Sequence, residues 1–529
     1  MVISQATVPT PVQRAPLKLV AVGDSLTAGF QDATLVAERQ EHSYPSQIAR
    51  AANLDFKQPL MSGRGIPPRI FEDQNISLVG TVWRYLQVGL AMSVPMAALA
   101  MGAVPPEPVL WPLYYAGGMG KMTEGHDTDL QNVAVPNFEL RHFSDVNNVL
   151  DLMQDMADKR TQSGALMMLA PYVHCILQEE RSAEHGRSMI DKAIAQNPDV
   201  VVFWGGNNDA LESVNGGVVD DRTLTPLDDQ KWTYHVKNPF TGRSSLKETE
   251  TVNPGFRTSL QKSLGRLLNE TRAEIVVLNI PDVTVIPYLM TVGEKVGPLP
   301  YKVVLPNGTD VTSKLENWVI PDTIRGEGQD GRTTFPPGSR VGLKDMLIKF
   351  VQHGEIFSEN MLQSRLNEAS AEGLFTEDEV LTPDEIEKIH QRTEEYNELL
   401  RQTAAANPRL HLVDANALLM RAKEQGIELQ GSGEPATVTN VPTGVTDGRG
   451  FNGFFSYDGM HPSNVGHAVL GNAILDRLKA DLGRNPRFIA LTTAPAIDER
   501  AALRDDPRMK KGGTLVLSGM TLNKGWGFR

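Results

Sequence analysis

The strongest constraint on this fold is that three residue types suited to one hydrolytic site lie near opposite ends of a 529-residue chain. Near the start, the apolar run 19–22 ends in the tetrapeptide Gly-Asp-Ser-Leu, residues 23–26. Near the end, Asp458 and His461 stand three residues apart. Serine, histidine and aspartate can serve as the nucleophile, the base and the orienting carboxylate of a triad. If Ser25 and His461 share one site, most of the intervening chain belongs to one domain or is inserted into it.

The serine follows a run that predicts a buried strand, and open α/β sheets place their chemistry at the carboxyl ends of strands. A serine after a strand is more often the N-cap of the next helix, so the tetrapeptide alone does not identify a nucleophile. A second apolar run, 200–204, predicts a strand buried on both faces and ends in Gly-Gly-Asn-Asn-Asp, residues 205–209. That ending is also ordinary turn chemistry. The presence of Asp458 and His461 favours the catalytic interpretation of both segments.

These segments resemble the sequence blocks of the SGNH, or GDSL, hydrolase superfamily, which carry a serine, a glycine, an asparagine and a histidine in that order. The matching residues are 23–26, 206–209 and 458–462. Three further stretches are similar to the long bacterial acylhydrolase-type members: QPLM (58–61), AQNPDVVVFWGGNNDAL (195–211) and NIPDVTVIPY (279–288). The resemblance implies a three-layer, flavodoxin-like α/β fold of the SGNH type, with a central parallel sheet flanked by helices.

The resemblance also implies a reaction, the hydrolysis of carboxylic esters through an acyl-enzyme. Ser25 would be the nucleophile, His461 the general base and Asp458 the carboxylate that orients it. The oxyanion hole would combine the backbone N–H groups of Ser25 and Asn137 with the side-chain amide of Asn208. No cofactor or metal is implied, and the expected partner is a small-molecule or lipid ester.

One position departs from the family pattern. The family's second block usually reads Asn-x-x-x-Pro-Gly, and here Asn132 and Pro136 fit but Asn137 replaces the glycine. Asparagine is the non-glycine residue that best tolerates a positive φ, so we expect Asn137 to keep the backbone conformation and to supply its N–H. The alternative donor is Gly63 or Gly65 in the segment SGRGIPP.

The rest of the chain is organised around one predicted domain. We expect residues 18–483 to form the hydrolase domain, with insertions near 62–130, 215–250, 290–380 and 420–452. Residues 1–17 are expected to be a disordered N-terminal segment, and 484–529 a C-terminal tail whose role the sequence does not indicate. Alternating patterns predict strands at 55–60, 274–280 and 410–413, and helices that begin at Ser43, Pro254, Thr382 and Ser463. Such alternation is typical of a parallel sheet with right-handed crossovers.

Residues 85–106 form an uncharged stretch whose length meets the minimum for a membrane span. Pro95 interrupts its centre, and small residues, proline and glycine are frequent around it. We therefore expect a buried hairpin or pair of helices, with an apolar cover over the site or a true transmembrane helix as the alternatives. Stable insertion of the chain into a membrane is not expected.

Composition narrows the class of partner. The net charge of −13 disfavours nucleic acid and anionic membranes as general partners. Cys175 is the only cysteine, and its apolar neighbours favour a buried structural thiol over a nucleophile. His142 and His174 lack the clustered spacing of metal ligands. Residues 1–17 lack the apolar run of a signal peptide, so a cytoplasmic location is expected unless a leader has been removed.

Two other classes of function fit the same residues. Deacetylation of a polysaccharide, thioester hydrolysis or acyl transfer to an acceptor alcohol would use the same nucleophile. A non-catalytic, flavodoxin-like binding domain would hold a ligand at the carboxyl edge of the sheet without turnover, and would not need Asp458 and His461 three residues apart. The sequence leaves the acyl length, the alcohol moiety and the oligomeric state open.

Overall fold

The computed structural model describes residues 16–72, 120, 122, 129–157, 169–177, 187–237, 244–325, 334–352, 354–445 and 453–518. The apolar stretch 85–106 and most of the predicted N-terminal segment 1–17 lie outside these residues. Of the helices that the structure describes, none is both long and apolar enough to cross a bilayer.

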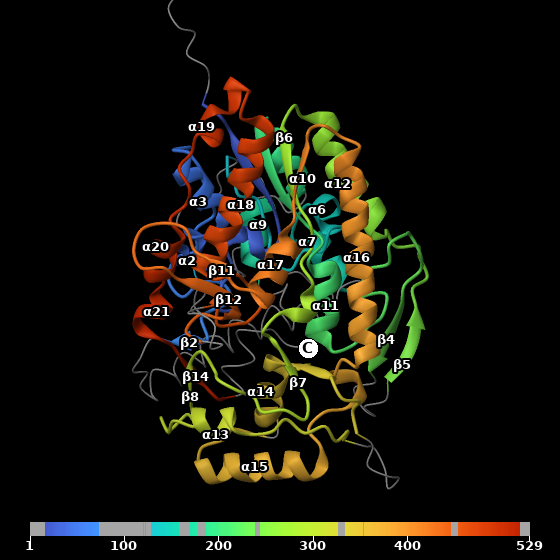
Figure 1. Ribbon diagram of the computed structural model, residues 1–529. Coiled ribbons are helices and arrows are strands. Elements are labelled where there is room, and N and C mark those ends of the chain that lie inside the picture. The colour runs from blue at the N-terminus through green and yellow to red at the C-terminus, as the bar shows by residue number, and fades with distance from the viewer. Residues whose placement is uncertain are drawn as a thin grey trace, which may run out of the picture.

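A four-stranded parallel sheet forms the centre of the molecule (Figure 1). Its strands lie in the order β1 (Leu19–Gly23), β3 (Val200–Trp204), β6 (Glu274–Leu278) and β10 (Leu410–Val413). The pairing is in register, with Val20 beside Val201 and Val201 beside Ile275. All residues of β1 and β3 are buried, as expected for apolar, β-branched runs that are covered on both faces.

Helices flank this sheet, as the sequence predicts. On one side α3 (Tyr44–Ala51) packs against the long α18 (Asn464–Leu482), and α18 also contacts β10. On the other side are α10 (Met189–Ala195), α12 (Phe256–Glu270) and α16 (Pro383–Ala405) (Figure 1). The fold is therefore α/β with a central parallel sheet flanked by helices.

Two of the predicted helix starts carry a side-chain cap and one does not. The Thr382 side chain accepts from the Glu385 N–H while the Glu385 carboxylate accepts from the Thr382 N–H, which is a complete capping box at the start of α16. Ser463 caps α18 by accepting from the Gly466 N–H. Ser43 precedes α3, but its hydroxyl contacts the Gln58 Oε1 atom at 3.4 Å instead of capping the helix.

The predicted strand at 55–60 is wrong. The segment lies outside the regular sheet, and its Lys57 carbonyl accepts from the Gln131 N–H at 2.8 Å. Residues 131–135 lie directly beside β1 instead, with the Ala21 N–H donating to the Gln131 carbonyl and the Val135 N–H donating to the Gly23 carbonyl. A chain segment distant in sequence has taken the sheet edge, which a local pattern cannot reveal.

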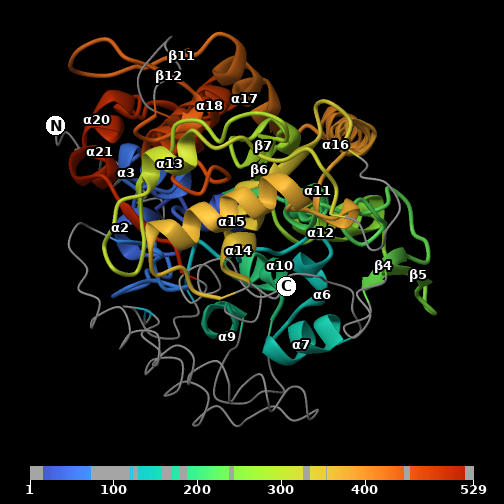
Figure 2. The same cartoon turned by 90° about the horizontal axis from the view of Figure 1, so that it is seen from below.

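The remaining elements lie around this core. Those in the first half of the chain are α1 (Ser25–Ala28), α2 (Ala37–Gln40), β2 (Phe71–Glu72), α6 (His142–Asp145), α7 (Val149–Ala157), α9 (Ala170–Leu177), α11 (Asn208–Gly216) and the hairpin β4 (Thr233–Lys237) and β5 (Ser244–Glu248). The second half holds η1 (Val283–Val285), β7 (Leu289–Thr291), β8 (Lys302–Val304), α13 (Thr312–Glu316), β9 (Arg340–Gly342), α14 (Leu343–Gln352), α15 (Glu359–Glu372), η2 (Glu377–Glu379), α17 (Ala415–Glu424), β11 (Ile427–Glu428), β12 (Thr437–Pro442) and β13 (Gly453–Phe455). Helices α13, α14 and α15 lie together below the central sheet in Figure 1 and face the viewer in Figure 2.

The C-terminal segment, residues 484–518, is built into the molecule. It contains η3 (Pro486–Phe488), α19 (Ile489–Thr492), α20 (Glu499–Arg504), α21 (Pro507–Lys511) and β14 (Thr514–Val516). Helices α19 and α20 pack against α18, and β14 lies between β2 and β8 in a second small sheet. This segment thus joins an early part of the chain to the 290–380 insertion.

Candidate active site

Ser25 lies where β1 ends and α1 begins. The Asp24 side chain caps that short helix by accepting from the Leu26 N–H at 3.0 Å. At Gly23 a Cβ atom would lie 2.0 Å from the Thr27 hydroxyl oxygen and 2.7 Å from the Trp204 carbonyl, so only glycine fits at this turn. The strand therefore delivers Ser25 to the carboxyl edge of the sheet, where the side chain is almost fully buried.

The structure brings the two ends of the chain together as the sequence predicts. The Ser25 Oγ and His461 Nε2 atoms are 2.9 Å apart, and the His461 Nδ1 atom is 2.9 Å from the Asp458 Oδ2 atom. A carboxylate can only accept, so Nδ1 carries the proton and Nε2 is free to accept from the serine hydroxyl. The Phe30 ring packs on the imidazole with ring centroids 4.7 Å apart. The geometry is that of a serine primed for deprotonation by a histidine.

Asp458 is held by donors on every side. Its Oδ1 atom accepts from the backbone N–H groups of Met460 and His461 and from the Ser456 hydroxyl, and its Oδ2 atom also accepts from the Ala33 N–H. Burial by itself would raise the pKa of Asp458, but the charge of His461 and these hydrogen bonds outweigh it and hold the pKa below its usual value. The carboxylate therefore stays ionised next to the imidazole.

Asn208 reaches the same site from the end of the second strand. It is the first residue of α11, and its Nδ2 group donates to the Phe138 carbonyl at 3.0 Å. A side-chain amide nitrogen carries two N–H bonds, so one donor is left for a second acceptor. Asn208 lines one cavity together with Ser25 and His461, as the sequence analysis expects.

A link between the first and second strand ends was missed by the sequence analysis. The Asn207 Nδ2 group donates to the Asp24 Oδ2 atom at 2.8 Å, which ties the start of α11 to the helix that carries Ser25. Asp24 is fully buried and this burial raises its pKa to about 6, despite the hydrogen bonds from Asn207 and Leu26. Both residues stand inside the matched sequence blocks, so their positions were available as a signal, but nothing local indicates that they pair.

Asn137 adopts the backbone conformation that the sequence analysis expects, with φ of 61°. It follows Pro136 in a turn closed by the Phe138 N–H and the Val135 carbonyl, which is the arrangement of a type II turn. The turn is fixed at both ends, since the Val135 N–H donates to the Gly23 carbonyl and the Phe138 carbonyl accepts from Asn208. Asn137 therefore lies between the two strand ends of the site, although it is not among the residues that line the cavity.

The alternative oxyanion donors are Gly63 and Gly65, and the cavity lining does not distinguish them from Asn137. Gly63 and Gly65 both have positive φ, of 67° and 81°. The Gly65 N–H donates to the Ser62 carbonyl at 3.4 Å, and neither glycine lines the cavity that contains Ser25.

The cavity beside Ser25 collects residues from the carboxyl ends of all four central strands. Its polar lining is Ser25, Asn207, Asn208 and His461, at one end of an otherwise apolar wall. The apolar residues are Leu26, Trp204, Leu211, Pro281, Val283, Ile286, Ala415, Leu419, Phe454, Phe455, Met460, Pro462 and Leu470. The space open to the centre of a water molecule is about 50 Å³, which makes this a small and apolar pocket.

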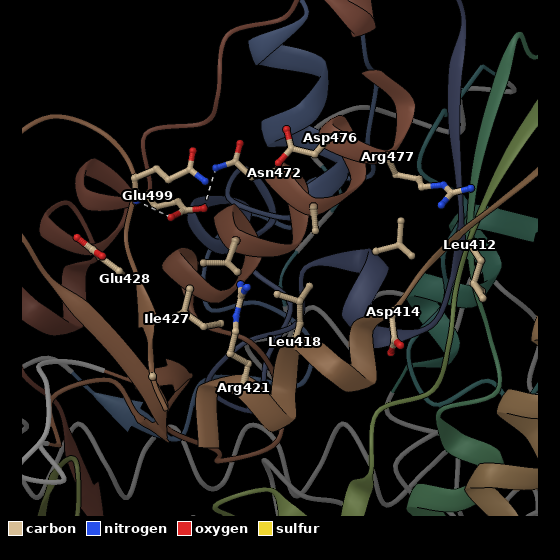
Figure 3. Close-up of a pocket in the computed structure, with 15 residues that line it drawn as sticks. Leu412, Asp414, Leu418, Arg421, Ile427, Glu428, Asn472, Asp476, Arg477 and Glu499 are labelled. Carbon is tan, nitrogen blue, oxygen red and sulfur yellow. Dashed lines mark hydrogen bonds between the residues drawn. The ribbon is translucent and has the colours of Figure 1, made fainter. Parts of the chain in front are cut away.

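A larger hollow of about 620 Å³ lies on the other face of α17 (Figure 3). Figure 3 shows Leu418 and Arg421 of α17 and its N-cap residue Asp414 on one side, and Asn472 and Asp476 of α18 on the other. Among the residues that the structure describes, no serine, cysteine or histidine lines it. Its residues offer a solvated, charged surface and not a nucleophile, so the smaller cavity is the candidate active site.

The other residues that the sequence analysis considered are structural. Cys175 is only partly buried, not fully buried as predicted, but burial still raises the pKa of its thiol to about 12, which favours the protonated form. His142 accepts from the Glu139 N–H at Nδ1, and its Nε2 atom is 3.2 Å from an Asp155 oxygen. Across the described ranges, no group of three potential metal ligands converges.

Comparisons of the chain with protein-family models, with curated proteins and with solved structures gave no match.

Proposed function

We propose that this protein is a serine hydrolase of the SGNH type that cleaves carboxylic esters through an acyl-enzyme. The observation that carries the proposal is the hydrogen-bonded series Ser25, His461 and Asp458, with both contacts at 2.9 Å. The order of the central strands, with the nucleophile directly after the first of them, supports the three-layer, flavodoxin-like version of the fold. A binding domain without turnover would have no need for this series.

In the proposed reaction, His461 takes the Ser25 proton at Nε2 as the serine oxygen attacks the ester carbonyl. The protonated imidazole then gives this proton to the leaving alcohol, which leaves the acyl group on Ser25. Water attacks the acyl-enzyme in the second step, with His461 again as the base. Asp458 keeps the imidazole in the productive tautomer and stabilises its positive charge, as its depressed pKa allows.

The carbonyl oxygen gains negative charge in both steps and needs donors that are already in place. The proposed donors are the Ser25 backbone N–H, the second N–H of the Asn208 amide and the Asn137 backbone N–H. Ser25 begins α1 and Asn208 begins α11, and both residues line the cavity. The hydrogen bond from Asn208 to the Phe138 carbonyl fixes the orientation of its amide before substrate binds.

The small cavity suggests a short acyl chain. The cavity wall is apolar beyond Ser25 and His461, which suits an alkyl group and not a charged one. We therefore propose acetyl to butyryl esters as the preferred class. The same limit makes deacetylation of an acetylated polysaccharide the second candidate function.

The proposal is tested with p-nitrophenyl esters from acetate to octanoate and with a fluorophosphonate probe that labels active serines. Wild-type protein should be labelled and should prefer the short esters, and Ser25→Ala and His461→Ala should each lose several orders of magnitude in turnover. Retained turnover or labelling in Ser25→Ala would refute the hydrolase proposal. Release of acetate from acetylated sugars in preference to simple esters would favour the second candidate.

The proposed acyl preference has its own matched pair of variants. Leu419 and Leu418 are neighbours on α17, but Leu419 lines the cavity beside Ser25 and Leu418 lines the hollow on the other face. Leu419→Ala should shift the preference toward longer acyl chains, whereas Leu418→Ala should leave the chain-length profile unchanged. The same shift in both variants would mean that this cavity does not hold the acyl group.

A further inference from the structure

We propose that Arg508 and Asp32 are positioning residues for Asp458, so that the C-terminal segment holds the carboxylate of the active site in place. This inference rests on the proposed hydrolase function. It goes beyond that function because neither residue belongs to the triad or the oxyanion hole, and because it gives the segment 484–518 a part in the reaction.

The first part of this arrangement is a tight turn that follows α1, the helix that carries Ser25. Gln31 and Thr34 exchange two backbone hydrogen bonds, of 3.1 and 3.0 Å. The two residues between them have positive φ, 54° at Asp32 and 59° at Ala33, which is the pattern of a type I′ turn. Such turns favour asparagine and glycine, and alanine is penalised in this conformation. The turn therefore needs support from its surroundings.

The turn directs its backbone N–H groups at the loop that carries Asp458. The Ala33 N–H donates to the Asp458 Oδ2 atom at 2.9 Å, which is the oxygen that also faces His461. The Asp32 N–H donates to the Ser456 hydroxyl, and this hydroxyl donates to the Asp458 Oδ1 atom at 3.1 Å. The turn therefore contacts both oxygens of the carboxylate, one directly and one through Ser456.

The Asp32 side chain is fixed by two arginines. Its Oδ2 atom accepts from the Arg39 Nη2 group at 2.9 Å and from the Arg508 Nε group at 2.8 Å, and its Oδ1 atom accepts from the Tyr457 N–H at 3.0 Å. Asp32 is buried, but the two guanidinium groups hold its pKa well below its usual range. Asp506 balances the second positive charge through a 2.8 Å contact to Arg39. The cluster is thus a closed set of two carboxylates and two guanidiniums.

Arg508 connects this cluster to the rest of the molecule. Its Nη2 group donates to the Phe71 carbonyl at 3.0 Å, and its guanidinium lies 5.0 Å from the centre of the Tyr457 ring. Tyr457 is the residue that precedes Asp458. Arg508 therefore contacts the loop that carries Asp458 in two ways, at the Tyr457 ring and through Asp32. A planar group with several fixed donors suits this role better than a lysine would.

The C-terminal segment is itself anchored to the helix that follows His461. The Asn472 Nδ2 group on α18 donates to the Ile497 carbonyl at 3.0 Å and to the Glu499 Oε1 atom at 2.8 Å, and the latter contact is visible in Figure 3. The Ile497 N–H donates back to the Asn472 Oδ1 atom at 2.7 Å. Movement of this segment would therefore be transmitted through Arg508 and Asp32 to the carboxylate.

The test compares Arg508→Met with Arg500→Met in the full-length protein. Arg500 lies in the same segment and donates to the carbonyls of Leu429, Gly431 and Gly433, away from the active site. Arg508→Met should lower kcat by about tenfold to a hundredfold with KM within about twofold, because a misplaced carboxylate affects the reaction more than binding. Arg500→Met should keep the wild-type kcat. Arg508→Lys should recover part of the loss.

A second variant covers the case in which Arg508→Met fails to fold. Ser456→Ala removes the relayed contact to Asp458 without leaving a buried charge, and should lower kcat several-fold at unchanged KM. The Nδ1 proton resonance of His461, which reports the hydrogen bond to Asp458, should shift in Ser456→Ala and Arg508→Met but not in Arg500→Met. A wild-type kcat in folded Arg508→Met or Ser456→Ala, or an equal loss in Arg500→Met, would overturn the inference. Retained turnover in Ser25→Ala would instead refute the hydrolase proposal.

Discussion

Two buried aspartates lie near Ser25, Asp24 beside it in the chain and Asp458 behind His461, and their surroundings shift their pKa values in opposite directions. Asp458 faces His461 and accepts from four further donors, and its pKa is lowered. Asp24 accepts from one backbone N–H and one amide, and burial raises its pKa to about 6. Burial is almost equal at the two positions, so the number and charge of the donors decides the difference.

The comparison separates the two halves of the proposed site. The half around Asp458 is an ionic network that keeps a charge fixed beside the base. The half around Asp24 connects neutral amides, including Asn207 and the adjacent Asn208, to the helix that carries Ser25. The ionised state matters to the first half, while shape matters to the second. Substitutions that remove charge but keep shape should therefore affect the two halves very differently.

The largest effect is expected from Asp458→Asn set against Asp24→Asn. Asp458→Asn should lower kcat by about a thousandfold to ten-thousandfold, because the imidazole loses its preferred tautomer and the partner for its positive charge. Asp24→Asn should cost about tenfold or less, because asparagine is as good an N-cap as aspartate and can keep the contact with the Leu26 N–H. The Asn207 Oδ1 atom has no hydrogen-bond partner among the described residues, so after a flip of that amide it can accept from the new side chain. Steady-state kinetics of both variants, with circular dichroism as the folding control, measure the contrast. Equal losses would erase the distinction between the two halves.

The next largest effect on turnover is expected at Asn208, in the half of the site that contains Asp24. Asn208→Ala should lower kcat by about a hundredfold to a thousandfold with little change in KM, as expected for loss of one oxyanion donor. Asn207→Ala is the matched control, since it removes the neighbouring amide and its contact to Asp24 but no proposed donor. A pre-steady-state burst assay with p-nitrophenyl acetate reports whether acylation is the step that slows. A larger loss of turnover in Asn207→Ala would contradict the oxyanion role of Asn208. It would indicate that the contact between Asn207 and Asp24 matters more to the site.

The sequence predicted the parts of this molecule that depend on short segments. Short segments with their own sequence signal include the apolar runs at β1 and β3, the capping box at Thr382, and the spacing of Asp458 and His461. The structure contains both strands and the capping box where the sequence predicted them. The carboxyl-edge placement of Ser25 followed from a general property of parallel sheets. These features are local or are shared by a whole class of folds.

The parts that the sequence did not reveal depend on pairs distant in the chain. Residues 131–135 occupy the sheet edge that the pattern at 55–60 suggested, because pairing partners are chosen by the tertiary structure. Asp32 lies a few residues after Ser25, but its proposed role depends on its contact with Arg508. No pattern around Asp32 or around Arg508 indicates that the two residues pair. The predicted tail beyond residue 483 likewise became part of the site's support only through such contacts.

A smaller effect is expected at Asn137, where the chain departs from the family pattern. Its φ of 61° suits glycine and asparagine but strains a β-branched residue. Asn137→Gly should stay within about twofold of wild-type turnover, and Asn137→Val should lose about tenfold or more as the strained turn moves its N–H away from the carbonyl oxygen. Thermal denaturation of both variants separates local displacement from unfolding. Unchanged turnover in a folded Asn137→Val would return Gly63 to consideration as the donor.

The last prediction concerns stability and not turnover. The pH dependence of the free energy of unfolding measures the difference between Asp24 and Asp458 most directly. The folded pKa of Asp24, about 6, exceeds the ordinary value of 3.8, so between these values the native state binds more protons than the unfolded state. The wild type should lose stability through this group as the pH rises from about 4 to about 6, by up to about 3 kcal/mol if the whole shift is realised. Asp24→Asn lacks this loss, so its free energy of unfolding relative to wild type should increase over that interval and then level off.

The effect at Asp458 has the opposite sign. Its lowered pKa contributes stability above the ordinary value, and this stability disappears as the pH falls through the folded pKa. Asp458→Asn should therefore be least stable relative to wild type near neutral pH. Urea denaturation of the three proteins from about pH 2 to about pH 8 covers both intervals, because the Asp458 effect lies below the ordinary value of 3.8 and the Asp24 effect lies between 3.8 and about 6. Parallel curves for the two variants would show that the two aspartates do not differ in the way their donors indicate.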